Sequence, residues 1–152
     1  MSIPDRIPIE RVPDYYTHYV GRSADGRQFM AFIVATLPKP SPPDWERHKR
    51  WYAVLHTFDR EGHHLNTEAR FVGLTSDGEA DVCERARGLR KELLASLGKR
   101  RYCDVSIRLF SVRVDGHLFG LEETTDEERG ESVTLWPNDF FFTPPWNGNY
   151  ST

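Results

Sequence analysis

The sequence has little cysteine, no long apolar run and no large excess of charge, and each absence narrows the class of protein. Only two cysteines occur among 152 residues, Cys83 and Cys103. We expect both to be reduced, small, buried side chains, because a chain of this length needs no disulfide to fold. No stretch approaches the roughly 20 apolar residues of a membrane span. The first residues are also not expected to act as a secretion signal, so the expected location is the cytoplasm.

Charge is nearly balanced over the whole chain but not along it. The net charge is −3, which gives no general attraction to nucleic acid or to an anionic membrane. Residues 77–152 carry ten basic and fourteen acidic side chains, and most of this excess lies in residues 122–131. We expect that segment to be a solvated loop, with a docking surface for a basic partner as the alternative.

Motifs of catalysis and of cofactor binding are absent as well. No nucleophile elbow, phosphate loop, dinucleotide fingerprint or zinc-ligand spacing occurs, so no catalytic residue, metal ligand or cofactor is assigned. Three of the six histidines fall in residues 56–65. His56 would project from a strand, while the adjacent His63 and His64 would point apart, so the three cannot converge on one ion. We predict a hairpin turn there instead.

Alternating apolar residues predict several strands. Residues 28–37 are apolar on both faces, which indicates a central, covered strand, and Asp25-Gly26 predicts a hairpin with a strand at 16–20. A second hairpin is predicted to join residues 51–58 to 65–73, and a third to turn at Asp115-Gly116. Between residues 103 and 114 the apolar phase changes at Leu109-Phe110, which predicts a β-bulge. Residues 132–136 form a further strand, and we expect the aromatic tail after them to pack on the core.

One helix is predicted at about 77–97. Apolar side chains recur at helical spacing from Val82 to Leu97, Ser76 and Glu79 match a capping box, and Gly98 is a natural C-terminal cap. Runs of strands around one helix predict an α+β domain over residues 1–152, with an antiparallel sheet of about six to seven strands and the helix packed on one face.

Two basic clusters and several tryptophans are the candidate partner-binding features. We predict binding through the residues that follow: Trp45, Arg47, Lys49, Arg50, Glu122, Glu123 and Trp146. Tryptophan and arginine are enriched in protein interfaces. For the basic clusters Arg47–Arg50 and Lys99–Arg101, phosphate binding is the functional interpretation, but we favour solvation for the first and compensation of the helix dipole for the second. For the tryptophans, packing against the sheet is the alternative.

Four segments together resemble a family of small bacterial proteins labelled formate hydrogenlyase regulatory proteins. They read PDYYTHYVGRSADGRQF, HKRWYAVLHTFDREGHHL, YCDVSIRLFSVRVDGHLFGL and GESVTLWPNDFFF. The similarity spans nearly the whole chain, and its motifs are structural. The resemblance implies an intracellular regulator of transcription, with no functional residue to carry over.

Four hypotheses of function follow. The first is a non-catalytic, cytoplasmic interaction or regulatory module with a protein partner and no contact with a membrane. The second is a transcriptional regulator that binds DNA through the basic clusters in a salt-dependent manner. The third is an immunity-type protein that neutralises a toxin, and the fourth is a hydrolase. A continuous basic face would favour the second, and an acidic groove the third.

Overall fold

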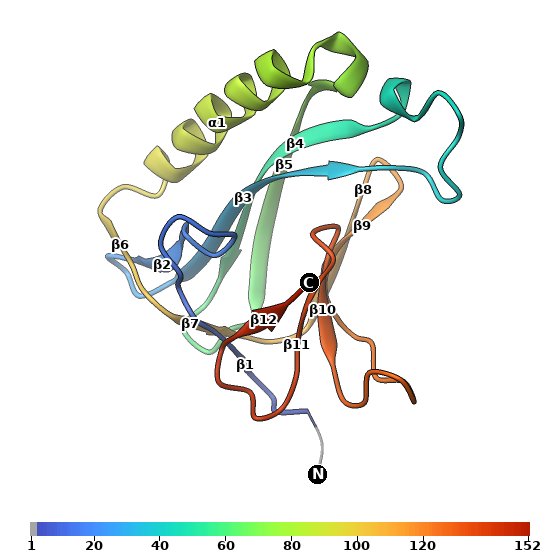
Figure 1. Ribbon diagram of the computed structural model, residues 1–152. Helices are drawn as coiled ribbons and strands as arrows, with labels where there is room; N and C mark the ends of the chain where they lie inside the picture. The colour runs from blue at the N-terminus through green and yellow to red at the C-terminus, as the bar shows by residue number, and fades with distance from the viewer. Residues whose placement is uncertain (1–2) are drawn as a thin grey trace.

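The structure is a computed structural model, which describes residues 3–152 (Figure 1). Those residues form twelve strands, all paired antiparallel in three sheets, and one α-helix, α1 (Glu79–Ala95). The first sheet contains, in spatial order, β5 (His64–Leu74), β4 (Arg50–Phe58), β3 (Gln28–Thr36), β2 (Val20–Ser23) and β6 (Arg100–Tyr102). The second contains β12 (Tyr150–Ser151), β11 (Phe140–Phe142), β10 (Val133–Trp136), β9 (His117–Glu123) and β8 (Phe110–Val114). A small third sheet pairs β1 (Ile7–Ile9) with β7 (Val105–Ile107).

The mixed class, mostly antiparallel sheet with one helix, agrees with the sequence prediction, but a single sheet of six to seven strands is wrong. The excess comes from short strands of two to four residues, such as β1, β6 and β12, which are too brief to show an alternating pattern. Two short 3₁₀ turns complete the elements, η1 (Trp45–Arg47) and η2 (Thr75–Asp77).

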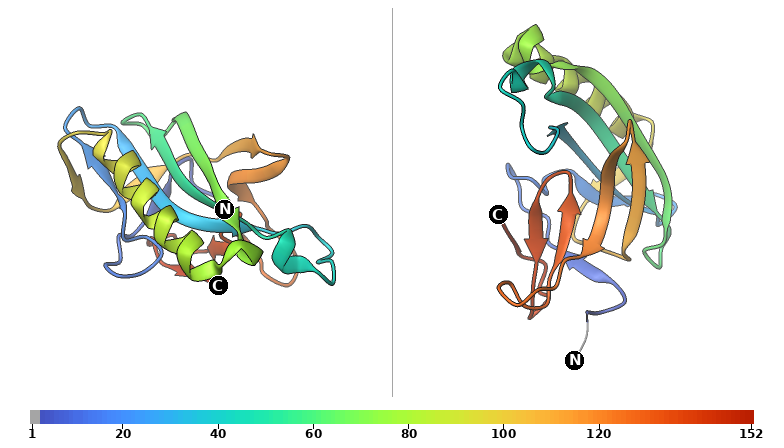
Figure 2. Two further views of the ribbon diagram at one scale, coloured as in Figure 1. Left: turned by 90° about the horizontal axis from the view of Figure 1, so that it is seen from above. Right: turned by 90° about the vertical axis from the view of Figure 1, so that its right-hand side faces the viewer.

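The central strands are covered on both faces, as the sequence predicts. On the outer face Phe29, Ala31 and Leu55 pack with Leu93 and Leu94 of α1. The inner face of the same strands joins a larger core that is shared by all three sheets. Figure 2 shows α1 lying across one side of the first sheet and the C-terminal sheet on the other side.

The chain crosses between sheets where a bulge was expected. Strand β7 ends at Ile107 in the small sheet, and β8 begins at Phe110 in the second five-stranded sheet. Arg108 and Leu109 form the crossing, so Ile107 and Phe110 both face the large core although they are out of phase. The predicted bulge is therefore wrong: a change of sheet, not an extra residue in one strand, causes the change of phase.

The start of α1 also differs from the prediction. The helix begins at Glu79 after Gly78, which has a φ of +107° and no side chain that could cap. Ser76 lies inside η2, and the carboxylate of Asp77 accepts the backbone N–H of Leu74 at 2.9 Å. The predicted capping box of Ser76 and Glu79 is therefore wrong: the chain makes one 3₁₀ turn before the α-helix starts, and the side chain that caps there is that of Asp77.

Three smaller expectations complete the comparison. The strand predicted at 16–20 begins only at Val20, because the Thr17 hydroxyl donates to the carbonyl of Glu10 and holds a turn there. Cys83 and Cys103 are unpaired and half-buried rather than fully buried. Phe140 and Phe142 of the aromatic tail are buried in the large core, as predicted. No helix in residues 3–152 combines the length and the apolar character that crossing a bilayer requires.

Candidate anion-binding site

Five cationic side chains line one recess at the end of the β2–β6 pair, which we call the basic cavity. They are Arg22 of β2, Arg60 of the β4–β5 turn, Lys99, and Arg100 and Arg101 of β6. The cavity has a volume of about 460 Å³, and its remaining wall comes from the β2–β3 turn. Positive charge from three separate parts of the chain therefore converges on one hollow.

The local structure explains why these cations meet. Gly98, with a φ of +73°, ends the last turn of α1, so Lys99 to Arg101 leave the helix directly into the edge strand β6. Strand β6 approaches β2 closely because Gly21 has no side chain: a Cβ there would lie 2.9 Å from the Cα of Tyr102. The register then sets Arg22 opposite Arg101, on the same face of the sheet.

The charges of the basic cavity are not neutralised by the described part of the chain. None of the five cations forms an ion pair within residues 3–152. Asp25, in the adjoining turn, is paired with Arg27 at 3.4 Å and accepts from the Ser23 hydroxyl at 2.6 Å. Arg60 donates to the backbone carbonyl of Asp25 at 2.7 and 3.0 Å, so it meets a neutral group. Like charges facing each other across a strand pair destabilise it, and an anion between them would remove that cost.

A second recess adjoins the first and shares Arg100 with it. Arg87, Arg90 and Lys91 of α1 line this cavity of about 430 Å³ together with Tyr19 and Tyr102. The guanidinium of Arg90 lies 4.3 Å from the centre of the Tyr19 ring, and burial lowers the pKa of Arg90 from its ordinary value. The positive surface therefore continues from the edge strand onto the C-terminal half of α1.

Arginine is the residue type best suited to bind phosphate or carboxylate, because its planar fork donates two parallel hydrogen bonds. Arg100, which lines the basic cavity, has a buried Nε without a partner in the described residues, and another nitrogen of its guanidinium donates to the carbonyl of Gly98 at 2.9 Å. The lining contains no carboxylate and no histidine. The arrangement is therefore chemically suited to hold an anion.

The candidate partner-binding residues around η1 mainly contact neighbouring side chains of the protein itself. Trp45 is 39% exposed, and the Nζ of Lys49 lies 5.6 Å from its ring centre and 5.2 Å from that of Trp51. Arg47 is exposed on η1. Arg50 donates through Nε to the hydroxyl of Tyr52 at 2.8 Å, as part of a partly exposed network within the chain.

That network joins β4 to the turn between β8 and β9. The Tyr52 hydroxyl donates to Asp115 at 2.7 Å, and Arg50 pairs with the same carboxylate at 3.3 Å. The hydrogen bond from Tyr52, aided by the ion pair with Arg50, holds the pKa of Asp115 below its usual value. Arg50 thus has a structural contact that the sequence could not reveal.

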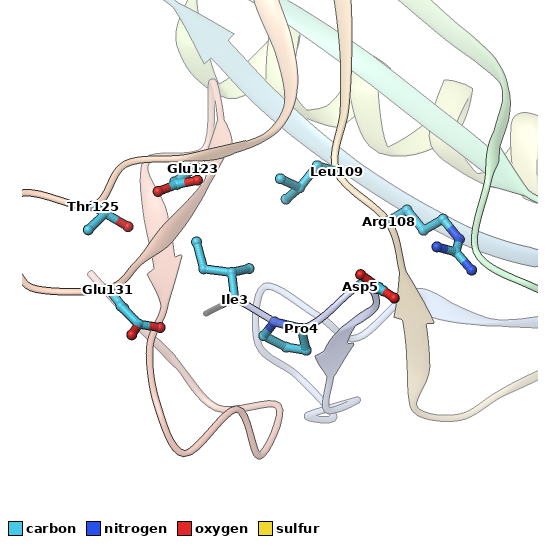
Figure 3. Close-up of a pocket in the computed structure, with 8 residues that line it drawn as sticks. All are labelled: Ile3, Pro4, Asp5, Arg108, Leu109, Glu123, Thr125 and Glu131. Carbon is cyan, nitrogen blue, oxygen red and sulfur yellow. The ribbon is translucent and has the colours of Figure 1, made fainter. Parts of the chain in front are cut away.

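The remaining candidate residues, two acidic and one near the C-terminus, lie elsewhere in the fold. Glu122 is half-buried in β9, and Trp146 packs against the large core. Glu123 lines a cavity of about 560 Å³. Figure 3 shows Glu123 and Glu131 on one side of it and Asp5 and Arg108 on the other. The seven predicted residues thus occupy three regions rather than one site, and their role in binding a partner stays a prediction.

The three histidines of residues 56–65 lie in two separate groups. His56 is fully buried, and the Thr67 hydroxyl lies 2.6 Å from its Nδ1 and 2.7 Å from the Nε2 of His64. His63, Asp59 and Glu61 come within 4.8 Å of one another at the surface. The Asp59 carboxylate there accepts the backbone N–H groups of both other residues at 2.9 Å, which is the geometry of a turn.

Comparison with protein-family models, with curated proteins and with solved structures found no match. The resemblance to the formate hydrogenlyase regulatory label therefore stays an expectation. The basic cavity has only a partial signal in the sequence. Lys99–Arg101 is visible as a cluster, but nothing near Arg22 or Arg60 indicates that they join it.

Proposed function

We propose that the protein is a non-catalytic regulatory module that binds a phosphate-bearing partner through the basic cavity. One observation supports it above all: five cationic side chains converge on a single recess and form no ion pair within the described residues. The module would act by binding, because the lining offers donors and charge but no acid–base pair.

Phosphate suits the recess better than the carboxylates of an acidic peptide. A phosphate group concentrates up to about two negative charges and three acceptor oxygens in one small volume. Carboxylates of an extended peptide carry one charge each and are spread along the chain at about 3.3 Å per residue. Arg22 and Arg101, opposite each other on the same face of the sheet at this hollow, match the compact anion. A phosphorylated protein segment and a free phosphate compound share this chemistry.

The first prediction concerns Lys99→Glu with Arg101→Glu. The probes are tripolyphosphate and a phosphoserine peptide, each titrated calorimetrically at low and high salt. We expect both probes to bind the unmodified protein, and we expect the double variant to bind them with about tenfold or more lower affinity. A tenfold loss corresponds to about 1.4 kcal/mol, which is modest for reversing two charges at one site. High salt should weaken binding by screening. Tighter binding of the phosphoserine peptide would indicate a phosphoprotein partner, and tighter binding of tripolyphosphate would indicate a free phosphate compound.

The matched control is Arg47→Glu with Arg85→Glu, which changes the net charge equally at exposed positions outside the basic cavity. This variant is expected to retain full affinity, and circular dichroism confirms that both variants fold. Equal losses in the two double variants would contradict the proposal and indicate attraction by overall charge. Duplex DNA is titrated in parallel: tight binding of DNA that depends on Arg47 would support the transcriptional regulator instead.

A further inference from the structure

A further cleft, of about 810 Å³, lies where three turns of the structure meet. Its walls come from the end of β3 with the loop after it, from the β8–β9 hairpin, and from the turn between β10 and β11. The volume lies within the range of about 300–1,000 Å³ that is typical of small-molecule sites. It shares no lining residue with the basic cavity.

The cleft has an aromatic and apolar wall. Trp136 is half-buried there, beside Leu37, Leu118 and Pro137. The Nζ of Lys39 lies 5.7 Å from the centre of the Trp136 ring, which places a cation close to the aromatic surface. A flat ring could therefore lie against Trp136 with its charged group beside Lys39.

Thr36, at the end of β3, lines the cleft, and its side chain has a buried polar atom without a partner in the described part of the chain. Thr36 is 3% exposed, and its hydroxyl forms no hydrogen bond with residues 3–152. Other buried threonines are satisfied: Thr75 accepts from the indole of Trp51 at 2.9 Å, and Thr134 contacts the hydroxyl of Thr124 at 2.7 Å. A buried hydroxyl without a partner is unfavourable, so a ligand that reached the Thr36 hydroxyl from the cleft would remove that cost.

The charged groups of the cleft favour an anion. Lys39 and Arg113 are its basic residues, and Asp139 is its one carboxylate. Arg113 forms no ion pair in the described part of the chain and donates only weakly, at 3.4 Å, to the carbonyl of Gly116. The His117 imidazole adds a further donor or acceptor.

We infer that this cleft binds a small aromatic carboxylate. The ring packs against Trp136, the carboxylate lies between Lys39 and Arg113, and the Thr36 hydroxyl donates to the ligand. The inference is independent of the basic cavity, which has a different lining and suits a more highly charged anion. It gives the proposed module a second, small-molecule site.

The test uses 2-naphthoate as the probe and the neutral 2-naphthalenemethanol as its matched control. Calorimetry and backbone-amide NMR are expected to show saturable binding of the carboxylate at least tenfold tighter than that of the alcohol. The amide shifts should centre on Thr36, Lys39 and Trp136. Arg113→Glu should weaken binding at least tenfold, whereas Arg85→Glu, at an exposed position outside both cavities, should leave it unchanged.

Thr36→Val separates a ligand contact from a structural role. If the hydroxyl serves the ligand, this nearly isosteric change weakens naphthoate binding several-fold and leaves the Tm without ligand unchanged or raised. A Tm that falls while affinity is unchanged would overturn the role of Thr36. Absence of binding at millimolar naphthoate, equal binding of the neutral alcohol, or indifference to Arg113→Glu would overturn the site.

Discussion

Replacing Phe119 with alanine is expected to lower the free energy of unfolding by about 3–5 kcal/mol, the range for removal of a fully buried aromatic ring. Phe119 of β9 is fully buried in the large core. Its ring packs edge-to-face on Tyr52 of β4, with centroids 5.5 Å apart, and so joins the two five-stranded sheets. Truncation would leave a cavity between sheets that share no strand pairing.

Phe71→Ala is the matched control for that prediction. Phe71 also contacts Tyr52 edge-to-face, at 5.9 Å, but it is 44% exposed. Its loss is expected to cost about 1 kcal/mol, mostly through its contact with Arg50. Urea unfolding at neutral pH measures both variants. Similar losses would show that the core between the sheets contributes less than its burial implies.

Acid is expected to destabilise the protein through His56. Burial, with a smaller effect from His64, lowers the pKa of His56 from 6.5 to about 3. Below pH 6.5 the unfolded chain therefore binds a proton that the folded chain refuses, and stability falls as pH falls. The loss is about 1.4 kcal/mol per pH unit, hence about 2 kcal/mol between pH 6.5 and 5. Burial also lowers the pKa of His64, which adds in the same direction.

The measurement is the free energy of unfolding in urea at pH values from 7.5 to 5. His56→Gln cannot titrate, so its stability should depend on pH more weakly than that of the unmodified protein, whatever its stability at pH 7.5. His48→Gln changes an exposed histidine of the loop before β4 and should keep the full dependence. Parallel profiles for the unmodified protein and His56→Gln would refute the assignment.

Local sequence patterns were sufficient to predict the elements that depend mainly on interactions between residues close together in the sequence. Strand β3 was recognised as covered on both faces because its nine residues alternate between two apolar sets. The turns Asp25-Gly26 and Asp115-Gly116 were predicted because glycine adopts positive φ without strain, and both glycines do so. The stripe from Val82 to Leu94 gave the buried face of α1 for the same local reason.

The candidate sites were much less accessible to sequence reasoning. Lys99–Arg101 was visible as a basic cluster, but compensation of the helix dipole was the favoured interpretation. The cluster becomes part of a candidate anion-binding site only through the pairing of β6 with β2, which brings Arg22 opposite Arg101. For Arg50 the structure had the opposite effect. The sequence indicates a basic side chain available to a partner, but Arg50 contacts Asp115, which is 65 residues further along the chain. The unpaired hydroxyl of Thr36 has no sequence signal at all.

The sequence by itself determined a strand-rich chain with one amphipathic helix, the main turns, and a near-neutral charge without recognisable catalytic motifs. Only the tertiary structure decided that the strands divide into three sheets, that Arg108-Leu109 is a crossing between sheets, and which charges meet. The physical reason is the range of the interactions involved. Periodicity and turn propensity depend on residues a few positions apart, whereas a cavity depends on which distant strands pair, and in which register.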